Sequence, residues 1–407
     1  MYYQRALREC WTDAGDQFPV LLLTGPRQVG KTTLLQHLCE KSRRYVTLDD
    51  PSIRTLARED PALLLQRFEP PVLIDEIQYA PQLLPLIKIA VDAEPRPGLF
   101  WLTGSQQFQM MRGISETLAG RVAILNLLGF SGRERHRLEL NTSPFMPTQT
   151  ALRERENSAV DSSLKSIYKD IWLGSFPALI AGPVKDRDLF YSSYLQTYLQ
   201  RDVRDLAQIG SEAAFVRFLR ACAALSGQML NLTQLARDAD VAVNTAKNWL
   251  SILKASFQIF LLQPYHTNLT KRLVKTPKLY FLDTGLCAYL TEWSSPETLA
   301  AGAMSGAILE TYALCELLKS WWHRGKKPLL YYYRDKDQRE IDFLLIQDQI
   351  SYPLEIKKSA SPTREWVGHF SALSRLKRQV GEGGVLCLCK QMMPLTETAN
   401  AIPIGMI

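Results

Sequence analysis

Short apolar runs alternate with segments of helical periodicity over the first 140 residues. The runs lie at residues 20–23, 45–48, 72–74, 99–102 and 122–128, and residues 1–17 carry Tyr3, Leu7 and Trp11 at four-residue spacing. Continuous apolar runs of this length are typical of strands that are buried on both faces, and intervening helices allow such strands to run parallel. The pattern therefore predicts an α/β domain with a parallel sheet over residues 1–140.

A glycine-rich turn follows the first apolar run and opens into a helical segment. It has the spacing G-x-x-x-x-G-K-T and consists of Gly25, Pro26, Arg27, Gln28, Val29, Gly30, Lys31, Thr32 and Thr33. Glycines let backbone N–H groups close around a phosphate, and the N-terminus of the helix adds partial positive charge. Lys31 is expected to reach the β- and γ-phosphates, and the Thr32 hydroxyl to ligate Mg²⁺. The strand, turn and helix predict a site for a nucleoside triphosphate.

Two other runs end in polar residues that suit the same site. Asp75 and Glu76 follow the run at 72–74, and Thr103 and Ser105 follow the run at 99–102. Asp75 would hold Mg²⁺ through water, and Glu76 would act as the general base for an attacking water molecule. Ser105 or Thr103 would contact the γ-phosphate or this water, because ligands bind beyond the carboxyl ends of parallel strands. An acidic helix start is the alternative interpretation of the two acids.

Arginines near the end of this domain are candidates for stabilising charge in a transition state. Arg112 lies within the helical pattern of residues 110–118, and Arg121 follows this pattern just before the last apolar run. An arginine of this kind often acts on the site of a neighbouring subunit, so either residue would act in trans within a homo-oligomer. A solvated surface arginine is the alternative for both.

The middle of the chain combines a polar stretch with compact helical patterns. Residues 141–163 are polar and indicate a linker or a mobile insert. Residues 191–206 carry an aromatic stripe at helical spacing, which is expected to be buried in the core. Residues 213–253 then show a short helix, a tight turn and a longer helix, which is typical of helix-turn-helix organisation. Apolar runs at 260–262 and 279–282 would form the strands of a wing, with the basic residues 271–278 at its tip. This winged helix would contact DNA phosphates or serve as a plain interaction module.

The last hundred residues predict a helix followed by antiparallel strands. Residues 340–346 and 354–357 are strand-like, and a two-residue turn at 348–349 would place Asp342 opposite Glu355. Lys357 shares the strand face of Glu355, because side chains two residues apart point to the same side. Two carboxylates beside a lysine are suited to binding a divalent metal next to an attacking water. An ordinary charged outer face is the alternative.

The amino-acid composition excludes some classes of protein but does not identify a function. The 407 residues are 46% hydrophobic and 22% charged, which is ordinary for globular proteins, and the net charge of +7 permits a nucleic-acid partner without requiring one. We expect four regions, namely residues 1–140, 141–210, 211–295 and 296–407. Seven cysteines without a C-x-x-C pair, no signal-peptide core and no membrane-length apolar run indicate a cytoplasmic protein without membrane contact.

The order of these motifs resembles a known family. The turn at 25–33, the stretch 73–78, the stretch 102–105 and Leu118-Ala119-Gly120-Arg121 are similar to AAA-type ATP-binding proteins of bacteria and archaea, many of which have a C-terminal domain of unknown function. This resemblance implies ATP as the substrate, Asp75 and Glu76 as Walker B residues, and Ser105 as a sensor. Residues 128–131 depart from the proline-leucine-serine-phenylalanine stretch usual in that family, although Glu134 follows, and residues 280–286 resemble the motif that opens its C-terminal domain.

The last region resembles the restriction-endonuclease-like superfamily. Asp342, Glu355 and Lys357 match its Asp and Glu-x-Lys pattern, and Glu310 would be the upstream helical glutamate. The hypothesis favoured by the whole chain is an Mg²⁺-dependent ATPase coupled to DNA binding or processing. One alternative is a nucleotide-dependent protein-interaction switch with an inert nuclease-like domain. Another is an ATP-gated, Mg²⁺-dependent DNA nuclease.

Overall fold

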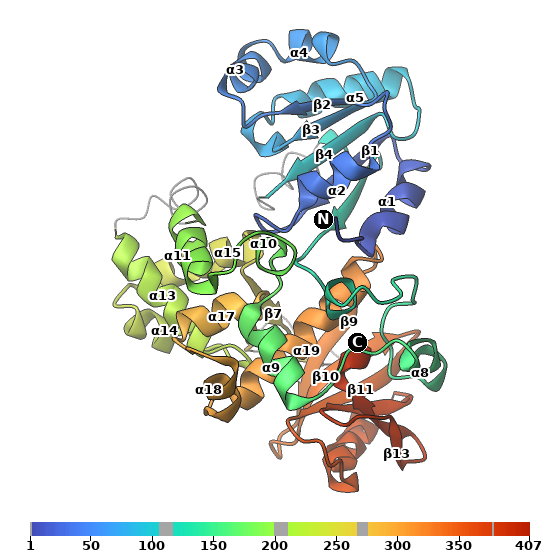
Figure 1. The fold of residues 1–407 in the computed structure, drawn as a ribbon, viewed down its shortest axis with the longest axis vertical. Coiled ribbons are helices and arrows are strands. Elements are labelled where there is room, and N and C mark those ends of the chain that lie inside the picture. Colours follow the sequence, from blue (N-terminus) through green and yellow to red (C-terminus); the bar gives the residue numbers. More distant parts are fainter. Residues whose placement is uncertain (1, 106–116, 199–210, 267–275, 377) are drawn as a thin grey trace.

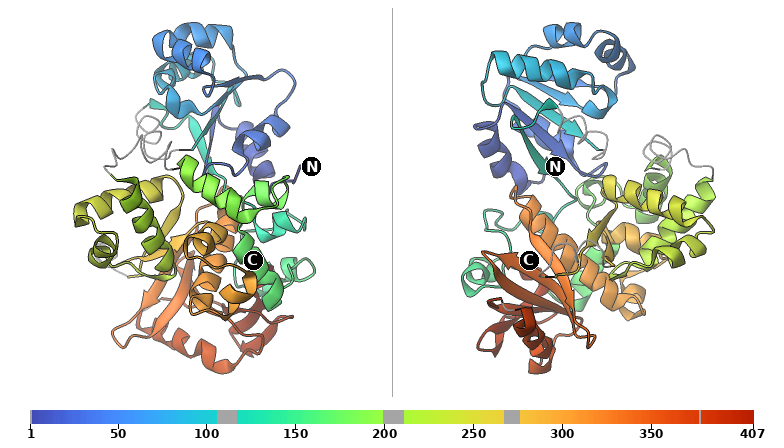
Figure 2. Two further views of the ribbon diagram at one scale, coloured as in Figure 1. Left: turned by 60° about the vertical axis from the view of Figure 1, so that its left-hand side comes forward. Right: turned by 180° about the vertical axis from the view of Figure 1, so that it is seen from behind.

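The computed structural model describes residues 2–105, 117–198, 211–266, 276–376 and 378–407 (Figure 1). An N-terminal sheet domain and a C-terminal sheet lie at opposite ends of the molecule, and the helical middle of the chain lies between them and to one side (Figures 1 and 2). Within the described ranges, no helix has both the length and the apolar character needed to cross a membrane. The α/β class expected from the sequence is confirmed.

The N-terminal domain is built on a parallel sheet with the strand order β2-β3-β4-β1-β5. Its strands are β1 (Val20–Thr24), β2 (Arg44–Thr47), β3 (Val72–Asp75), β4 (Phe100–Gly104) and β5 (Val122–Asn126). Every residue of β1, β3 and β4 is buried, which is why these strands read as unbroken apolar runs. All five runs predicted from the sequence form strands of this sheet.

Helices cover both faces of this sheet and create two separate cores. They are α1 (Leu7–Gly15), α2 (Lys31–Leu38), α3 (Pro51–Glu59), α4 (Pro61–Arg67), the 3₁₀ turn η1 (Ile77–Tyr79) and α5 (Leu83–Ala93). Successive side chains of a strand point to opposite faces, so Leu22 packs with Ile87 of α5 while Leu21 packs with Trp11 of α1. The core that contains Leu21 continues into the middle and C-terminal regions, which joins the sheet domain to the rest of the chain.

The stretch expected to be a linker is a packed part of the fold. Helix α7 (Gly132–Arg135) follows the sheet, and α8 (Gln149–Glu156) lies within residues 141–163. Arg155 of α8 is buried and donates to the carbonyl oxygens of Met406 and Ile407, so this stretch is held against the last residues of the chain. Three more helices follow: α9 (Leu164–Leu173), α10 (Pro177–Ile180) and α11 (Arg187–Tyr198). The tyrosine stripe of α11 is buried as expected, and its predicted continuation to residue 206 lies outside the described residues.

A helical cluster with a small antiparallel sheet occupies residues 211–281. Its helices are α13 (Glu212–Ala224), α14 (Leu232–Asp238) and α15 (Val243–Ala255), and its sheet has the order β6 (Gln228–Met229), β8 (Lys278–Phe281), β7 (Ile259–Leu262). Trp249 of α15 makes edge contacts with Phe215 and Phe218 of α13, which fixes the two helices against each other. Residues 271–275 of the basic run lie outside the described residues.

The C-terminal region joins helices to a mixed sheet. The helices are α17 (Thr284–Leu290), α18 (Pro296–Ala301) and α19 (Ser305–Trp322), and the 3₁₀ segments are η3 (Arg364–Leu376) and η4 (Ile404–Met406). The sheet has the order β13-β14-β12-β11-β10-β9, formed by β9 (Leu329–Arg334), β10 (Glu340–Gln347), β11 (Ile350–Lys357), β12 (Gly383–Cys387), β13 (Met393–Thr396) and β14 (Ala399–Pro403).

The hairpin of β10 and β11 has the register expected from the sequence. Asp348 and Gln349 have φ angles of 50° and 65°, as in the tight turns that join antiparallel strands, and Gln347 pairs with Ile350. Asp342 accepts a hydrogen bond from the Ile356 N–H at 2.9 Å, so its side chain lies beside the end of β11 that carries Glu355 and Lys357.

Candidate functional site

The phosphate loop connects the end of β1 to the start of α2. A Cβ atom at Gly25, where φ is 150°, would lie 2.0 Å from the Leu127 carbonyl oxygen, so only glycine lets the loop pass this close to the chain after β5. Gly30 has φ of 87°, a left-handed conformation that costs glycine little. Lys31 donates from Nζ to the carbonyl oxygens of Gly25 and Pro26 at 3.0 Å and 2.8 Å. The loop backbone therefore curls around the Lys31 ammonium group.

The remaining loop residues differ in exposure. Pro26 and Val29 are buried, Arg27 is partly buried, and Gln28 and Thr33 are exposed. The exposed Thr33 lies one position after Thr32 on α2, so the two hydroxyls have different surroundings. The apolar side chains of Pro26 and Val29 thus pack into the protein, while the loop backbone forms the turn that phosphate binding requires.

The Asp75 carboxylate lies at the carboxyl end of β3 and faces the start of α2. Thr32 Oγ1 lies 2.9 Å and 3.0 Å from its two oxygens, Thr103 donates to Oδ1, and Tyr45 donates to Oδ2 at 3.2 Å. Burial raises the pKa of Asp75, and the hydrogen bonds from Thr103 and Thr32 oppose this rise. A hydroxyl beside a carboxylate fits Mg²⁺, which binds a few protein oxygens and keeps water and phosphate as its other ligands.

Glu76 follows Asp75 and lies in a small polar group with Ser105. The Glu76 backbone has φ of 58°, and its N–H donates to Thr103 Oγ1 at 3.1 Å. Gln78 donates from its amide to the Glu76 carboxylate and to Ser105 Oγ, the latter at 3.2 Å, and Ser105 Oγ lies 3.4 Å from Glu76 Oε2. The structure thus brings together the predicted base and the predicted sensor, and it adds Gln78, which the sequence reasoning did not single out.

Arg121, one of the two candidate arginines, does not reach this site within the same chain. Arg121 immediately precedes β5, whereas the phosphate loop begins at the opposite, carboxyl edge of the parallel sheet. The Arg121 guanidinium is paired with Asp92, with 2.5 Å from Nε to Oδ1 and 3.2 Å from Nη2 to Oδ2. An action of Arg121 on its own site is therefore excluded by its position in the sheet. Arg112 lies outside the described residues.

Comparisons with known proteins identify the family of this chain. The AAA domain family matches residues 17–136, and two domain families of unknown function match residues 164–297 (DUF8612) and 305–407 (DUF4143). Uncharacterised proteins of Mycobacterium bovis and Mycobacterium tuberculosis are each 30% identical over 395 residues, which is 96% of this chain and 81% of theirs. The chain belongs to the AAA-type P-loop ATPases with a C-terminal domain of unknown function. ATP binding and hydrolysis follow from this membership.

Two solved structures match this ATPase at low sequence identity and low structural similarity. A Walker-type ATPase of Pyrococcus abyssi is 18% identical, with 70% of this chain and 94% of that chain covered and a TM-score of 0.42. RuvB of Thermotoga maritima is 16% identical, with 63% of this chain and 85% of that chain covered and a TM-score of 0.28.

A second group of charged residues lies in the C-terminal half of this ATPase. Lys278 is buried, and its Nζ lies 3.0 Å from Glu310, 2.6 Å from Glu340 and 4.0 Å from Asp342. Burial opposes the charge on Lys278, but the surrounding carboxylates outweigh it and raise its pKa. The prediction that Lys278 belongs to an exposed basic wing tip is wrong, because these ion pairs hold it inside the protein.

The other predicted residues of the nuclease-like site join the same group. Lys357 Nζ lies 2.7 Å from Glu355 Oε1, and the other oxygen of Glu355 is buried without a hydrogen-bond partner. Burial and the nearby Asp342 raise the pKa of Glu355 to about 8 and that of Glu310 to about 7, and burial also raises the pKa of Asp342. We call Lys278, Glu310, Glu340, Asp342, Glu355 and Lys357 the acidic cluster.

The acidic cluster already contains a positive charge. Lys278 Nζ lies 3.0 Å from Glu310 and 4.0 Å from Asp342, so its ammonium group would compete with a divalent cation for these two carboxylates. Across the described ranges, no set of three or more His, Cys, Asp or Glu side chains is arranged to hold a metal ion.

Proposed function

We propose that this ATPase depends on Mg²⁺ and couples ATP hydrolysis to DNA binding. The observation that carries the Mg²⁺ assignment is the contact of Thr32 with Asp75 beside Lys31. Thr32 and Asp75 would hold the ion, which supplies positive charge to the β- and γ-phosphate oxygens. Lys31 would bind the same phosphates from the other side of the loop. These roles use the Thr32 hydroxyl, the Asp75 carboxylate and the Lys31 ammonium group at this edge of the sheet.

Glu76 is proposed as the general base of hydrolysis. It would take a proton from the water whose oxygen attacks the γ-phosphorus, while the bond from that phosphorus to the bridging oxygen of ADP breaks. Ser105 lies next to Glu76 and would contact the γ-phosphate or the water. Gln78 donates to both side chains and would hold the Glu76 carboxylate in place. An arginine of another copy, Arg121 or Arg112, would complete the site in a homo-oligomer.

DNA binding is assigned to helices α14 and α15 and the strands β7 and β8, which we interpret as a winged helix. The outer face of α15 is exposed and polar, and it carries Asn244, Lys247, Asn248 and Lys254. Lysines of this kind bind phosphates, and asparagines can bind base edges in the major groove. The inner face of α15 packs through Trp249, so the outer residues are not needed for the core.

Stimulation of ATP hydrolysis by DNA tests this coupling. We expect duplex DNA to raise the rate of the wild type, and the double variant Lys247→Ala, Lys254→Ala to lose the stimulation while its rate without DNA is unchanged. The matched control is Lys165→Ala, Lys169→Ala, which removes two exposed lysines from α9. A wild-type rate that ignores DNA at low salt would contradict the coupling.

A second candidate function is a nucleotide-dependent switch that binds protein partners. The acidic cluster favours it, because Lys278 lies within ion-pair distance of Glu310, Glu340 and Asp342 and already supplies positive charge to these carboxylates. The nuclease alternative has less support, since Lys278 would compete with a metal ion for Asp342. Incubation of the wild type and Asp342→Ala with plasmid, Mg²⁺ and ATP separates these possibilities, since cleavage by the wild type that disappears in the variant would support the nuclease function.

A cytoplasmic location is proposed as well, because all seven cysteines have free thiols.

A further inference from the structure

Arg5 lies buried behind the phosphate loop, just before α1. Its Nη1 donates to the Val29 carbonyl oxygen at 2.8 Å, and its Nη2 donates to the carbonyl oxygens of Leu128 at 2.7 Å and Gly129 at 3.2 Å. Its Nε lies 3.0 Å from Glu134 Oε1. One side chain therefore joins the loop, the chain after β5 and a buried carboxylate.

The contact with Val29 constrains a backbone group that phosphate binding uses. The Val29 carbonyl and the Gly30 N–H belong to the same peptide unit, and a planar trans peptide points these two groups in opposite directions. When Arg5 holds the carbonyl from behind, the Gly30 N–H is turned toward the inside of the loop. N–H groups that face inward are the ones that bind phosphate in a loop of this spacing.

Glu134 holds Arg5 and is itself fixed on several sides. Its Oε1 accepts from the Ala6 N–H and its Oε2 from the Ser131 N–H, both at 2.8 Å, and His323 Nδ1 lies 3.5 Å from Oε1. Burial acts to raise the pKa of Glu134, but Arg5 and His323 outweigh it and hold the pKa well below its usual range. Glu134 therefore stays charged and keeps Arg5 in one orientation.

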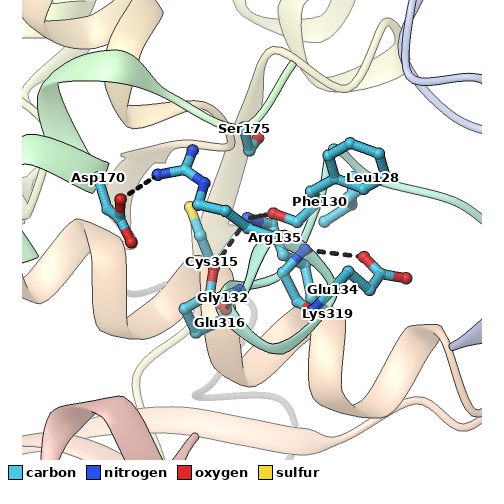
Figure 3. Close-up of polar contacts among 12 residues, drawn as sticks. Leu128, Phe130, Gly132, Glu134, Arg135, Asp170, Ser175, Cys315, Glu316 and Lys319 are labelled. Atoms are coloured by element: carbon cyan, nitrogen blue, oxygen red, sulfur yellow. Dashed lines mark hydrogen bonds and ion pairs between the residues drawn. The ribbon is translucent and has the colours of Figure 1, made fainter. Parts of the chain in front are cut away.

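Helix α19 of the C-terminal region holds the chain that follows β5, at residues 128–132. Leu128 donates its N–H to His323 Nε2 at 3.1 Å, Gly132 donates to Glu316 at 2.7 Å, and Lys319 donates to the Phe130 carbonyl at 2.9 Å. Figure 3 shows Glu316 and Lys319 reaching from α19 toward the turn that carries Phe130, Gly132 and Glu134. The carboxylate that orients Arg5 thus lies between the phosphate loop and the C-terminal region.

We propose that Arg5 is a positioning residue for ATP binding, which sets the Val29–Gly30 peptide of the phosphate loop and is itself oriented by Glu134. The inference rests on ATP binding at this loop and not on DNA contact. It assigns no contact between Arg5 and the nucleotide. Its effect should therefore appear mainly in the affinity for ATP, and less in the rate of the chemical step once ATP is bound.

Arg5→Lys is the variant that tests this role. Lysine keeps the positive charge opposite Glu134, but its single nitrogen cannot reproduce the fork that joins Val29, Leu128 and Glu134. The matched control is Arg133→Lys. Arg133 is also buried, and it donates to the carbonyl oxygens of Glu139 and Ser158, away from the phosphate loop.

Equilibrium titration with a fluorescent ATP analogue gives the decisive measurement on the full chain. We expect Arg5→Lys to weaken binding by about tenfold or more, as for loss of a charge-assisted hydrogen bond, and to raise KM more than it lowers kcat. Arg133→Lys should bind like the wild type. Wild-type affinity in Arg5→Lys, or an equal loss in Arg133→Lys, would overturn the inference.

Glu134→Gln provides a second test, should Arg5→Lys fold poorly. It leaves Arg5 in place and removes the charge that orients it, so we expect weaker binding of the same analogue, and unchanged binding would again count against the role of Arg5. Absence of binding by the wild type is a different result, because it would contradict the nucleotide site itself.

Discussion

Thr32 and Asp75 are separated by 43 positions in the chain, yet the Thr32 hydroxyl lies 2.9 Å from an oxygen of the Asp75 carboxylate. They meet because β1 and β3 both pair in parallel with β4, so the loop after β1 and the acid at the end of β3 share one edge of the sheet. Lys31 lies on the loop side of this contact, and Glu76 follows Asp75. This arrangement is the physical basis for proposing Mg²⁺-dependent hydrolysis.

Removal of the Thr32 hydroxyl should change the Mg²⁺ dependence of the ATPase. We expect Thr32→Ala to need roughly tenfold more Mg²⁺ for half-maximal ATP hydrolysis, since the hydroxyl proposed to ligate the ion is lost. Thr32→Ser keeps the hydroxyl and should stay close to the wild type. A Mg²⁺ titration of the steady-state rate checks this, and identical curves for alanine and wild type would remove Thr32 from the metal site.

Replacement of Glu76 should separate ATP binding from hydrolysis. Glu76→Gln keeps the shape of the side chain but cannot accept a proton, so we expect kcat to fall about 10²- to 10⁴-fold while affinity for ATP is kept. Single-turnover hydrolysis and nucleotide binding on the same preparation give both quantities. The control is Glu59→Gln, on an exposed glutamate of α3. A Glu76 variant that hydrolyses ATP normally would require a different base.

The sequence allowed the phosphate loop, Asp75, Glu76 and Ser105 to be predicted because their signals are local. Each lies at or just after the carboxyl end of a strand. In a parallel sheet these ends lie along one edge, whatever the rest of the chain does. The same rule argues against Arg121 acting in its own chain, since it precedes a strand rather than following one. Register along β10 and β11 was also predictable, because a two-residue turn fixes it.

Features that depend on distant packing could not be predicted in this way. Lys278 follows several other basic residues, which suggested exposure, but its burial is decided by Glu310, 32 positions later, and by Glu340. Arg5 gives no local sign of its role either, because its partners Val29 and Glu134 lie 24 and 129 positions away. Gln78 was visible two positions after Glu76, yet only the fold shows that it also reaches Ser105.

Removal of the Lys278 charge should destabilise the protein strongly. Lys278→Met removes the buried cation from the largely buried carboxylates of Glu310 and Asp342, and breaking a buried ion pair on one side costs about 3–5 kcal/mol. The control is Lys327→Met, at an exposed position before β9. Denaturant unfolding measures the free energy of unfolding of both variants and of the wild type. If the two variants lost equally little stability, Lys278 would not be the cation that balances this cluster.

The acidic cluster should also make stability depend on pH. The pKa of Glu310 is raised from 4.5 to about 7, so the folded protein keeps a proton that the unfolded chain has lost between these values. Its contribution to stability is therefore complete below about pH 4.5 and is lost as pH rises through about 7. Glu310→Gln cannot titrate, so between pH 5 and 8 its melting temperature should fall less than that of the wild type. Parallel pH profiles of the two proteins would contradict the raised pKa.

The most direct test of the account is ATP hydrolysis by Lys31→Ala, with Lys41→Ala as a control at an exposed lysine shortly after α2. Lys31 is the only lysine of the phosphate loop, and its removal takes away the charge that binds the β- and γ-phosphates. We predict Mg²⁺-dependent phosphate release by the wild type and by Lys41→Ala, and none above background by Lys31→Ala. Unchanged turnover in Lys31→Ala would contradict the assignment of this loop as the ATPase site.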